Sequence, residues 1–208
     1  MELVPTTDEQ LRHLAEDDPH LGPHFAGVFP SDRLPPRPIR DRAQGYIVNV
    51  DPHDRPGSHW MALWTPGPDD DEEEDTCLVM DSFGLPLWRY GAPALEDWLE
   101  KHWSTLRFNR RSLQAIDSNT CGAYALLFLV HCSLGGTLQT FQQYFSRYDF
   151  VKNDARAAAW FKRLVRRDLA WHRLTGPIRQ SNHVPVRLMD MLMTMTGSPE
   201  GQNYDTVY

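Results

Sequence analysis

The sequence predicts an α+β protein, because short strand-like segments are concentrated in one part of the chain and helical patterns dominate the rest. β-branched and aromatic residues predict three neighbouring strands, at 45–50, 59–64 and 76–81. The segment 121–133 has helical length and is apolar on nearly all of its faces. A helix of this kind is buried, so we expect it at the centre of the domain.

The other elements follow from capping and spacing. Thr7 and Gln10 have the spacing of a capping box, which predicts a short amphipathic helix over 7–15. Apolar residues at helical spacing predict three further helices, at 93–103, 138–148 and 154–174. Residues 106–113 could form a further strand. Proline and glycine are dense over 22–42, where we expect an irregular segment.

Length and composition bound the class of protein. The chain has 208 residues, and we expect a single domain over 1–196 followed by a mobile tail, 197–208. Hydrophobic residues make up 41% and charged residues 24%, which is ordinary for a soluble globular protein, and the apolar runs are too short for a membrane span. The first residues lack the features of a secretory signal, so we expect an intracellular protein.

Cysteine and charge content narrow the possible functions. The three cysteines, Cys77, Cys121 and Cys132, cannot all pair and lack CxxC spacing, which argues against a disulfide framework or a zinc site. We therefore expect no metal or other cofactor. The net charge of −7 argues against wholesale nucleic-acid binding, although much of it comes from one acidic run, 69–75, which we expect in a surface loop.

Cys121 is the candidate nucleophile. It follows residues 117–120, each of which can cap a helix, and it opens the apolar helix. Unpaired N–H groups and the positive end of the helix dipole favour thiolate over thiol at such a position. Gln114, seven positions upstream, could bring its side-chain amide beside the sulfur as a donor to an oxyanion. The alternative is an inert cysteine that only packs in the core.

A base and a carboxylate to orient it are found in the predicted strands. If 59–64 and 76–81 form an antiparallel hairpin, His59 and Asp81 lie at the same end of the sheet. Together with the thiol and the amide, they complete the four groups that a cysteine protease needs. The alternatives are a half-exposed His59 and an Asp81 that only caps the following turn.

Three motifs carry a resemblance to a known family: Gly57-Ser58-His59-Trp60-Met61-Ala62, Asp81-Ser82-Phe83-Gly84, and Gln114 with Cys121-Gly122. They closely resemble the adenovirus-type cysteine proteases, the adenain family, and more distantly the SUMO-deconjugating, Ulp-like proteases of the same clan. The segment from Leu21 to Phe29 is also similar to the family's Gly-Pro-Tyr-Phe-Leu-Gly segment. The resemblance covers roughly residues 7–174.

The resemblance implies an α+β, papain-like fold with permuted chain order, in which a mixed sheet packs against the central buried helix. It implies a cysteine endopeptidase that cleaves viral precursor proteins during virion maturation, in the host nucleus and the virion, at sites with small glycine-containing sequences before the scissile bond. By position, His59 would be the base, Asp81 its orienting group and Cys121 the nucleophile. Gln114 and the backbone N–H of Cys121 would form the oxyanion hole.

The family is activated by a short viral peptide, joined through a disulfide, and by DNA on a basic surface. No cysteine lies between Asp81 and Gln114, where the family's tethering cysteine falls, so we expect no covalent link to a peptide. The acidic run argues against stimulation by DNA. A basic helix face between Arg156 and Arg173 could hold DNA or an acidic partner weakly, or be an ordinary solvated surface.

Two other functions stay open. An isopeptidase that removes ubiquitin-like modifiers would use the same four groups as an endopeptidase. A non-enzymatic binding module would keep Cys121 packed and unreactive.

Overall fold

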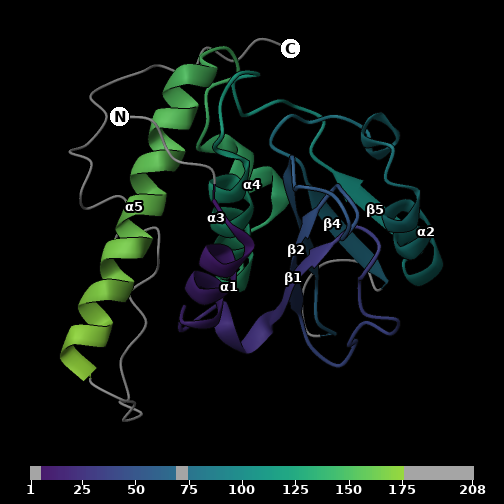
Figure 1. The fold of residues 1–208 in the computed structure, drawn as a ribbon, viewed down its shortest axis with the longest axis horizontal. Coiled ribbons are helices and arrows are strands. Elements are labelled where there is room, and N and C mark those ends of the chain that lie inside the picture. Colours follow the sequence, from purple (N-terminus) through teal and green to yellow (C-terminus); the bar gives the residue numbers. More distant parts are fainter. Residues whose placement is uncertain (1–5, 69–74, 176–208) are drawn as a thin grey trace.

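The computed structural model of this chain describes residues 6–68 and 75–175, and for residues 168–175 it describes the backbone alone. Within these residues the fold is α+β, as predicted, with one five-stranded mixed sheet (Figure 1). The strands are β1 (Phe25–Pro30), β2 (Gln44–Asn49), β3 (Trp60–Thr65), β4 (Thr76–Met80) and β5 (Thr105–Phe108). The α-helices are α1 (Asp8–Glu16), α2 (Pro93–His102), α3 (Cys121–Ser133), α4 (Leu138–Gln143) and α5 (Phe150–Thr175). Two short 3-10 helices are η1 (Gly22–His24) and η2 (Leu87–Tyr90).

The sheet has the strand order β1-β2-β3-β4-β5 and helices on both faces. The pairs β1/β2 and β4/β5 are parallel, whereas β2/β3 and β3/β4 are antiparallel. In Figure 1, α1, α3, α4 and α5 lie on one side of the sheet and α2 on the other. Side chains alternate between the two cores: Ile47 packs on the α3 side, and Tyr46 and Val48 pack on the α2 side.

The helix α3 is the buried centre of the larger core, as its sequence predicted. Residues 122–132 are all buried, and they pack against β3, α5 and α4. Apolar burial of this extent fixes the helix against the sheet, because each fully buried Leu, Val or Phe side chain contributes about 1.5–3 kcal/mol. The first residue of the helix, Cys121, is therefore held at a defined place at the end of the sheet.

Most predicted elements are present with shifted ends. The capping box of Thr7 and Gln10 is formed at the start of α1, which confirms the first helix. The predicted strands 45–50, 59–64 and 76–81 correspond to β2, β3 and β4. The three later helices correspond to α2, α4 and α5, but α4 is only six residues long and α5 begins at Phe150. There the carboxylate of Asp149 accepts from the backbone N–H of Lys152 and caps the longer helix.

Two sequence predictions are corrected. The segment 22–42 is not wholly irregular, because it contains β1, whose residues pair in parallel with β2. The local sequence could not predict this strand, because no local pattern indicates a parallel partner. Gly27, with φ of 137°, lies where the register of that pairing shifts. The strand expected over 106–113 ends at Phe108, since the next residue, Asn109, turns its side chain to the backbone of Asp81.

Several predictions fall on residues that the structure does not describe. They concern the tail 197–208 and residues 69–74 of the acidic run, so the single domain over 1–196 stays a prediction. Within the described ranges, the helices lack the combination of length and apolar character that crossing a membrane requires.

Candidate active site

The antiparallel pair β3/β4 brings His59 and Asp81 together. Ala62 pairs with Met80, so His59, just before β3, and Asp81, just after β4, lie at the same end of the sheet. The Nε2 atom of the imidazole is 2.7 Å from Oδ1 of Asp81, and both side chains are buried. An ionised carboxylate only accepts hydrogen bonds, so Nε2 carries the hydrogen and Nδ1 is the nitrogen available to a thiol.

The carboxylate of Asp81 is held by three donors in addition to His59. The backbone N–H of Phe83 donates to Oδ1 at 3.1 Å, and the backbone N–H of Leu85 and the hydroxyl of Tyr90 donate to Oδ2, both at 2.7 Å. Burial raises the pKa of a carboxyl group. The hydrogen bond and charge of His59, with the bonds from Tyr90 and Leu85, outweigh burial and lower the pKa of Asp81, so the group is ionised.

The turn that follows Asp81 depends on Gly84. Its φ is 64°, and a Cβ there would lie 2.6 Å from the carbonyl carbon of Arg111. Only glycine fits this left-handed position without strain. Asn109 fixes the backbone of Asp81 itself, since its side chain accepts from the backbone N–H of Asp81 and donates to the backbone carbonyl of the same residue.

Two aromatic rings enclose the imidazole of His59. Phe83 stacks with a centroid separation of 4.8 Å, and Tyr90 stacks at 5.2 Å with only 5° between the planes. Burial lowers the pKa of a histidine, but hydrogen bonds and charges from Asp81 and Cys121 raise the pKa of His59 to about 9. The imidazole is therefore held in one orientation and is protonated at neutral pH.

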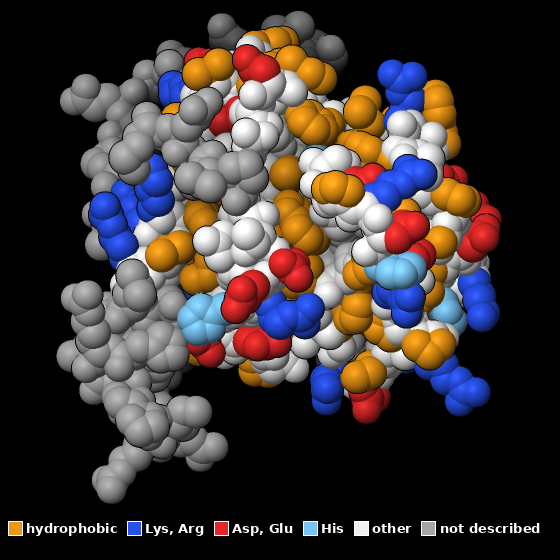
Figure 2. All heavy atoms as spheres, in the orientation of Figure 1, with side chains coloured by type: hydrophobic (Ala, Val, Ile, Leu, Met, Phe, Trp, Pro, Cys, Tyr) orange, Lys and Arg blue, Asp and Glu red, His pale blue; other side chains and the backbone are white. Residues whose placement is uncertain are grey.

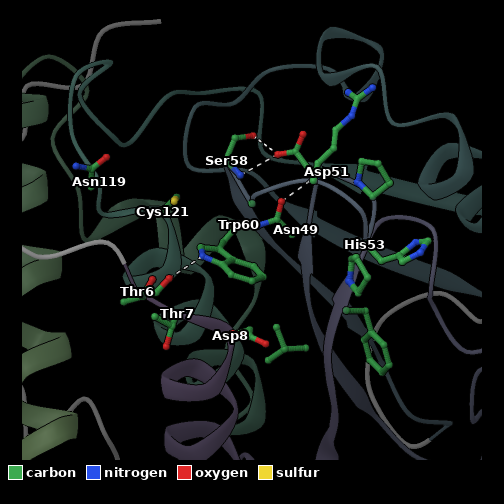
Figure 3. Close-up of a pocket in the computed structure, with 16 residues that line it drawn as sticks. Thr6, Thr7, Asp8, Asn49, Asp51, His53, Ser58, Trp60, Asn119 and Cys121 are labelled. Carbon is green, nitrogen blue, oxygen red and sulfur yellow. Dashed lines mark hydrogen bonds between the residues drawn. The ribbon is translucent and has the colours of Figure 1, made fainter.

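Cys121 lies at the N-terminus of α3 and remains partly exposed, whereas Cys77 and Cys132 are buried, and none of the three is part of a disulfide. It lines a pocket of about 440 Å³. Figure 3 shows Cys121 on the pocket wall between Asn119 and Trp60. Cys121 is thus partly exposed at the pocket, whereas the other two cysteines are buried.

The surroundings of Cys121 lower the pKa of its thiol. Burial raises its pKa, but a hydrogen bond from His59, the charge of that ring, and backbone hydrogen bonds from Trp60 and Gly122 together lower the pKa below its ordinary value. The same thiol–imidazole contact helps to raise the pKa of His59. Opposite shifts on the two partners are what an imidazolium–thiolate pair produces.

The amide of Gln114 is held in the loop that leads to Cys121. Its Oε1 accepts from the hydroxyl of Ser82 at 2.6 Å, and its Nε2 donates to the carbonyl of Ser118 at 2.8 Å. A carbonyl can only accept, so the NH₂ group must face Ser118 and the orientation of the amide is fixed. These contacts hold Gln114 between Ser82, at the end of β4, and Ser118, in the loop before Cys121.

The N-terminal end of the described chain forms another wall of the pocket. The indole Nε1 of Trp60 donates to the backbone carbonyl of Thr6 at 3.1 Å, as Figure 3 shows. Gly122 makes room for Thr6, because a Cβ on Gly122 would lie 1.8 Å from the Thr6 hydroxyl oxygen. The absence of a side chain at Gly122 therefore allows this segment to pack beside Cys121.

Sequence reasoning missed several residues that support these groups. Tyr90 and Asn109 contact Asp81 from nine and 28 residues further along the chain, and Ser82 contacts Gln114, 32 residues away. None has a motif spacing that would have singled it out, although Ser82 lies within the quoted Asp-Ser-Phe-Gly motif. Within the described residues, no group of three His, Cys, Asp or Glu side chains could hold a metal ion.

The basic residues of α5 form a separate surface. Figure 2 shows Lys and Arg side chains gathered over α5, at the left of the view. Two of them are engaged within the protein: Arg167 pairs with the carboxylate of Asp18, and Arg156 donates to the carbonyl of Tyr144. Arg173 lies among the residues whose side chains are not described, so a DNA contact on this face stays a prediction.

The fold and the site define an α+β protein in which a thiol, an imidazole, a carboxylate and a side-chain amide gather at one end of a mixed sheet. Over 124 residues, the sequence is 29% identical to a protein named "Protease" from human adenovirus A serotype 12. This match covers 52% of the present chain and 55% of the relative, so the chain spans about half the length of the curated relative it matches. No protein-family model matches. The similarity supports a distant relationship to the adenovirus protease.

Proposed function

We propose that this chain is a cysteine endopeptidase of the adenain type, which cleaves viral precursor proteins during virion maturation in the host nucleus and the virion. The observation that carries the proposal is the 2.7 Å hydrogen bond between His59 and Asp81, next to a thiol whose pKa the same imidazole lowers. The similarity to an adenovirus protein named as a protease supports the same reaction class.

The first half of the reaction acylates the enzyme. The Cys121 thiolate attacks the carbonyl carbon of the scissile peptide bond, and the carbonyl oxygen becomes an oxyanion. The imidazolium of His59 then gives its Nδ1 proton to the leaving amine, and the C–N bond breaks to leave a thioester. Asp81 keeps the ring oriented and stabilises its positive charge without itself taking the proton.

The second half releases the new carboxyl end. His59, now neutral, accepts a proton from a water molecule that attacks the carbonyl carbon of the thioester, which restores the imidazolium. The tetrahedral intermediate then collapses, and cleavage of the C–S bond releases the new carboxyl end and restores the thiolate. In both halves the oxyanion needs donors. An NH₂ group has two hydrogens, and Ser118 accepts one from Gln114. The second, with the backbone N–H of Cys121, would serve the oxyanion.

The papain-like fold with permuted chain order is part of this proposal. A buried helix presents the nucleophile from its N-terminus, and the base and its carboxylate come from the adjacent sheet. In chain order the groups are His59, Asp81, Gln114 and Cys121, whereas papain has its glutamine and cysteine first. The same catalytic geometry is built in several orders on different folds.

The substrates we propose are polypeptides. The pocket beside Cys121, about 440 Å³ in volume, has the size of a site for a few residues of an extended chain. We propose that any activating peptide binds non-covalently, and that DNA contacts, if they form, use the basic face of α5.

The test compares wild-type protein with Cys121→Ala on two substrate sets: glycine-containing peptides and fusions to ubiquitin-like modifiers. We expect wild type to cleave the peptides, and Cys121→Ala to lose both cleavage and labelling by a thiol probe. Cys132→Ala is the matched control, since that cysteine is buried away from the pocket and should not affect labelling.

Each other outcome has a definite meaning. Cleavage that survives in Cys121→Ala would remove this thiol from the mechanism. Cleavage of the fusions alone would identify an isopeptidase with the same groups. A wild-type thiol that does not react with an alkylating agent at neutral pH would indicate a binding module.

A further inference from the structure

Asp154, in the first turns of α5, has a buried carboxylate that faces the loop before Cys121. Its Oδ2 accepts from the backbone N–H of Ala115 at 3.1 Å, and its Oδ1 accepts from the hydroxyl of Thr120 at 2.8 Å. The hydroxyl of Tyr124, one turn into α3, lies 3.1 Å from the same Oδ1. Asp154 is 8% exposed, so these protein groups, rather than bulk water, satisfy its two oxygens.

The two oxygens of this carboxylate hold opposite ends of one short loop. Ala115 directly follows Gln114, the proposed oxyanion donor, and Thr120 directly precedes Cys121, the proposed nucleophile. The Thr120 hydroxyl has a single hydrogen, which it must donate to the carboxylate, so the Ser118 hydroxyl donates to Thr120 at 3.0 Å. Asp154 therefore also fixes the direction of the hydrogen bonds inside the loop.

Asn153, the residue before Asp154 in α5, also binds the chain next to this loop. The side-chain amide of Asn153 donates to the carbonyl of Leu113 at 3.0 Å and to that of Ser146 at 2.9 Å. Leu113 immediately precedes Gln114. The first turns of α5 thus bind the chain on both sides of Gln114, while Ser82, from the end of β4, binds its side chain.

We propose that Asp154 is a positioning residue for catalysis, which holds the Gln114 amide and the start of α3 at the separation that an oxyanion hole requires. The inference rests on the proposed function, because it assigns Asp154 an effect exerted through Gln114. The carboxylate is suited to this role for a geometric reason. It accepts on two separate oxygens at once, whereas an asparagine amide would turn a donor toward either Ala115 or Thr120.

The test is Asp154→Asn, measured alone and combined with Gln114→Ala. We expect Asp154→Asn to lower kcat by about ten- to a hundredfold with little change in KM, because an oxyanion donor acts in the transition state and small misplacements are costly. In a Gln114→Ala background, the same change should lower kcat by less than about threefold, since two residues that act as one unit are not additive. Asp149→Asn is the matched control, because Asp149 precedes the same helix and its carboxylate is exposed.

A second pair of variants covers the case in which Asp154→Asn does not fold. Thr120→Val removes the hydroxyl but keeps the shape, and it should reproduce part of the loss in kcat. Thr120→Ser keeps the hydroxyl and should restore the wild-type rate. Equal losses in Thr120→Val and Thr120→Ser would overturn the proposal.

Amide hydrogen exchange separates this inference from the proposed function. Asp154→Asn should speed exchange at Ala115 while the centre of α3 stays protected. Unchanged exchange at Ala115, or an equal loss of kcat with and without Gln114, would overturn the positioning role. If wild type cleaves no substrate, the proposed function itself fails, and faster exchange would then show a purely structural anchor.

Discussion

The hydroxyl of Tyr90 donates a hydrogen bond to Oδ2 of Asp81 across 2.7 Å. The ring of the same tyrosine lies parallel to the imidazole of His59, with 5.2 Å between the centroids. One side chain thus supports both partners of the His59–Asp81 pair: it stabilises the negative charge of one and limits the rotation of the other.

Tyr90→Phe should separate these two effects. The variant keeps the stacked ring but loses a hydrogen bond to a charged group, which is worth about 1.5–3 kcal/mol, so the free energy of unfolding should fall by an amount in that range. Cleavage should fall far less than in Tyr90→Ala, which loses the ring as well. Denaturant unfolding and kcat measure the two quantities.

Tyr148→Phe is the control for this comparison, because Tyr148 is 88% exposed. It should leave both quantities unchanged. If Tyr90→Phe and Tyr90→Ala slow cleavage equally, the stacked ring has no role in orienting His59.

Asp81→Asn should narrow the pH range of activity from the alkaline side. In wild type, we expect the rate to rise as Cys121 ionises below the ordinary thiol value of 9.0 and to fall near pH 9 as His59 loses its proton. Because the hydrogen bond and charge of Asp81 raise the pKa of His59, their loss should move the alkaline limb down by about 1–3 pH units.

The measurement is kcat/KM against pH, with Asp97→Asn as control, since Asp97 is exposed on α2. A profile for Asp81→Asn with both limbs unmoved and only a lower plateau would contradict the ion-pair interpretation. Such a profile would mean that Asp81 only stabilises the turn that follows it.

Gln114→Ala should lower kcat by about a hundredfold or more, the usual cost of an oxyanion donor, with KM nearly unchanged. Thiol labelling of Cys121 should be unaffected, because the thiolate is stabilised by His59 and by backbone hydrogen bonds. Gln139→Ala, at an exposed position of α4, is the matched control. An increase in KM with kcat unchanged would instead place Gln114 in substrate binding.

Gly122→Ala tests the contact between the N-terminal segment and the site. Alanine normally favours a helix by up to about 1 kcal/mol over glycine, but overpacking costs about 1–3 kcal/mol. The Cβ would lie 1.8 Å from the Thr6 hydroxyl oxygen and 3.2 Å from Cδ1 of Trp60, so the steric cost should win. We expect lower stability and slower cleavage.

The double variant Gly122→Ala with Thr6→Gly should recover most of this loss, because it removes the side chain that the new methyl group meets. Thermal unfolding measures the stability of the single and double variants, and kcat measures their rate of cleavage. Equal losses with and without Thr6→Gly would mean that the strain arises elsewhere in α3.

Local patterns in the sequence were sufficient for most elements. The capping box at Thr7 and Gln10 predicted α1, and the uniform apolarity of residues 122–132 predicted a buried helix, because both signals depend only on neighbours in the chain. β1 could not be predicted in this way. Its pairing with β2 is parallel and non-local, and its sequence is rich in glycine and proline.

The four candidate site residues were chosen for their types, motifs and expected register, and their chemical roles stay predictions. The sequence by itself determined which side chains carry reactive groups, and it predicted that His59 and Asp81 share one end of the sheet if their strands form an antiparallel hairpin, because strand periodicity and turn position are local properties. Only the tertiary structure decided what surrounds those groups: Tyr90 against both partners, Thr6 against Gly122, and Asp154 across the loop before Cys121. Those contacts join segments far apart in the chain, and it is packing in three dimensions, together with the exclusion of water, that shifts the pKa values of the thiol and the imidazole.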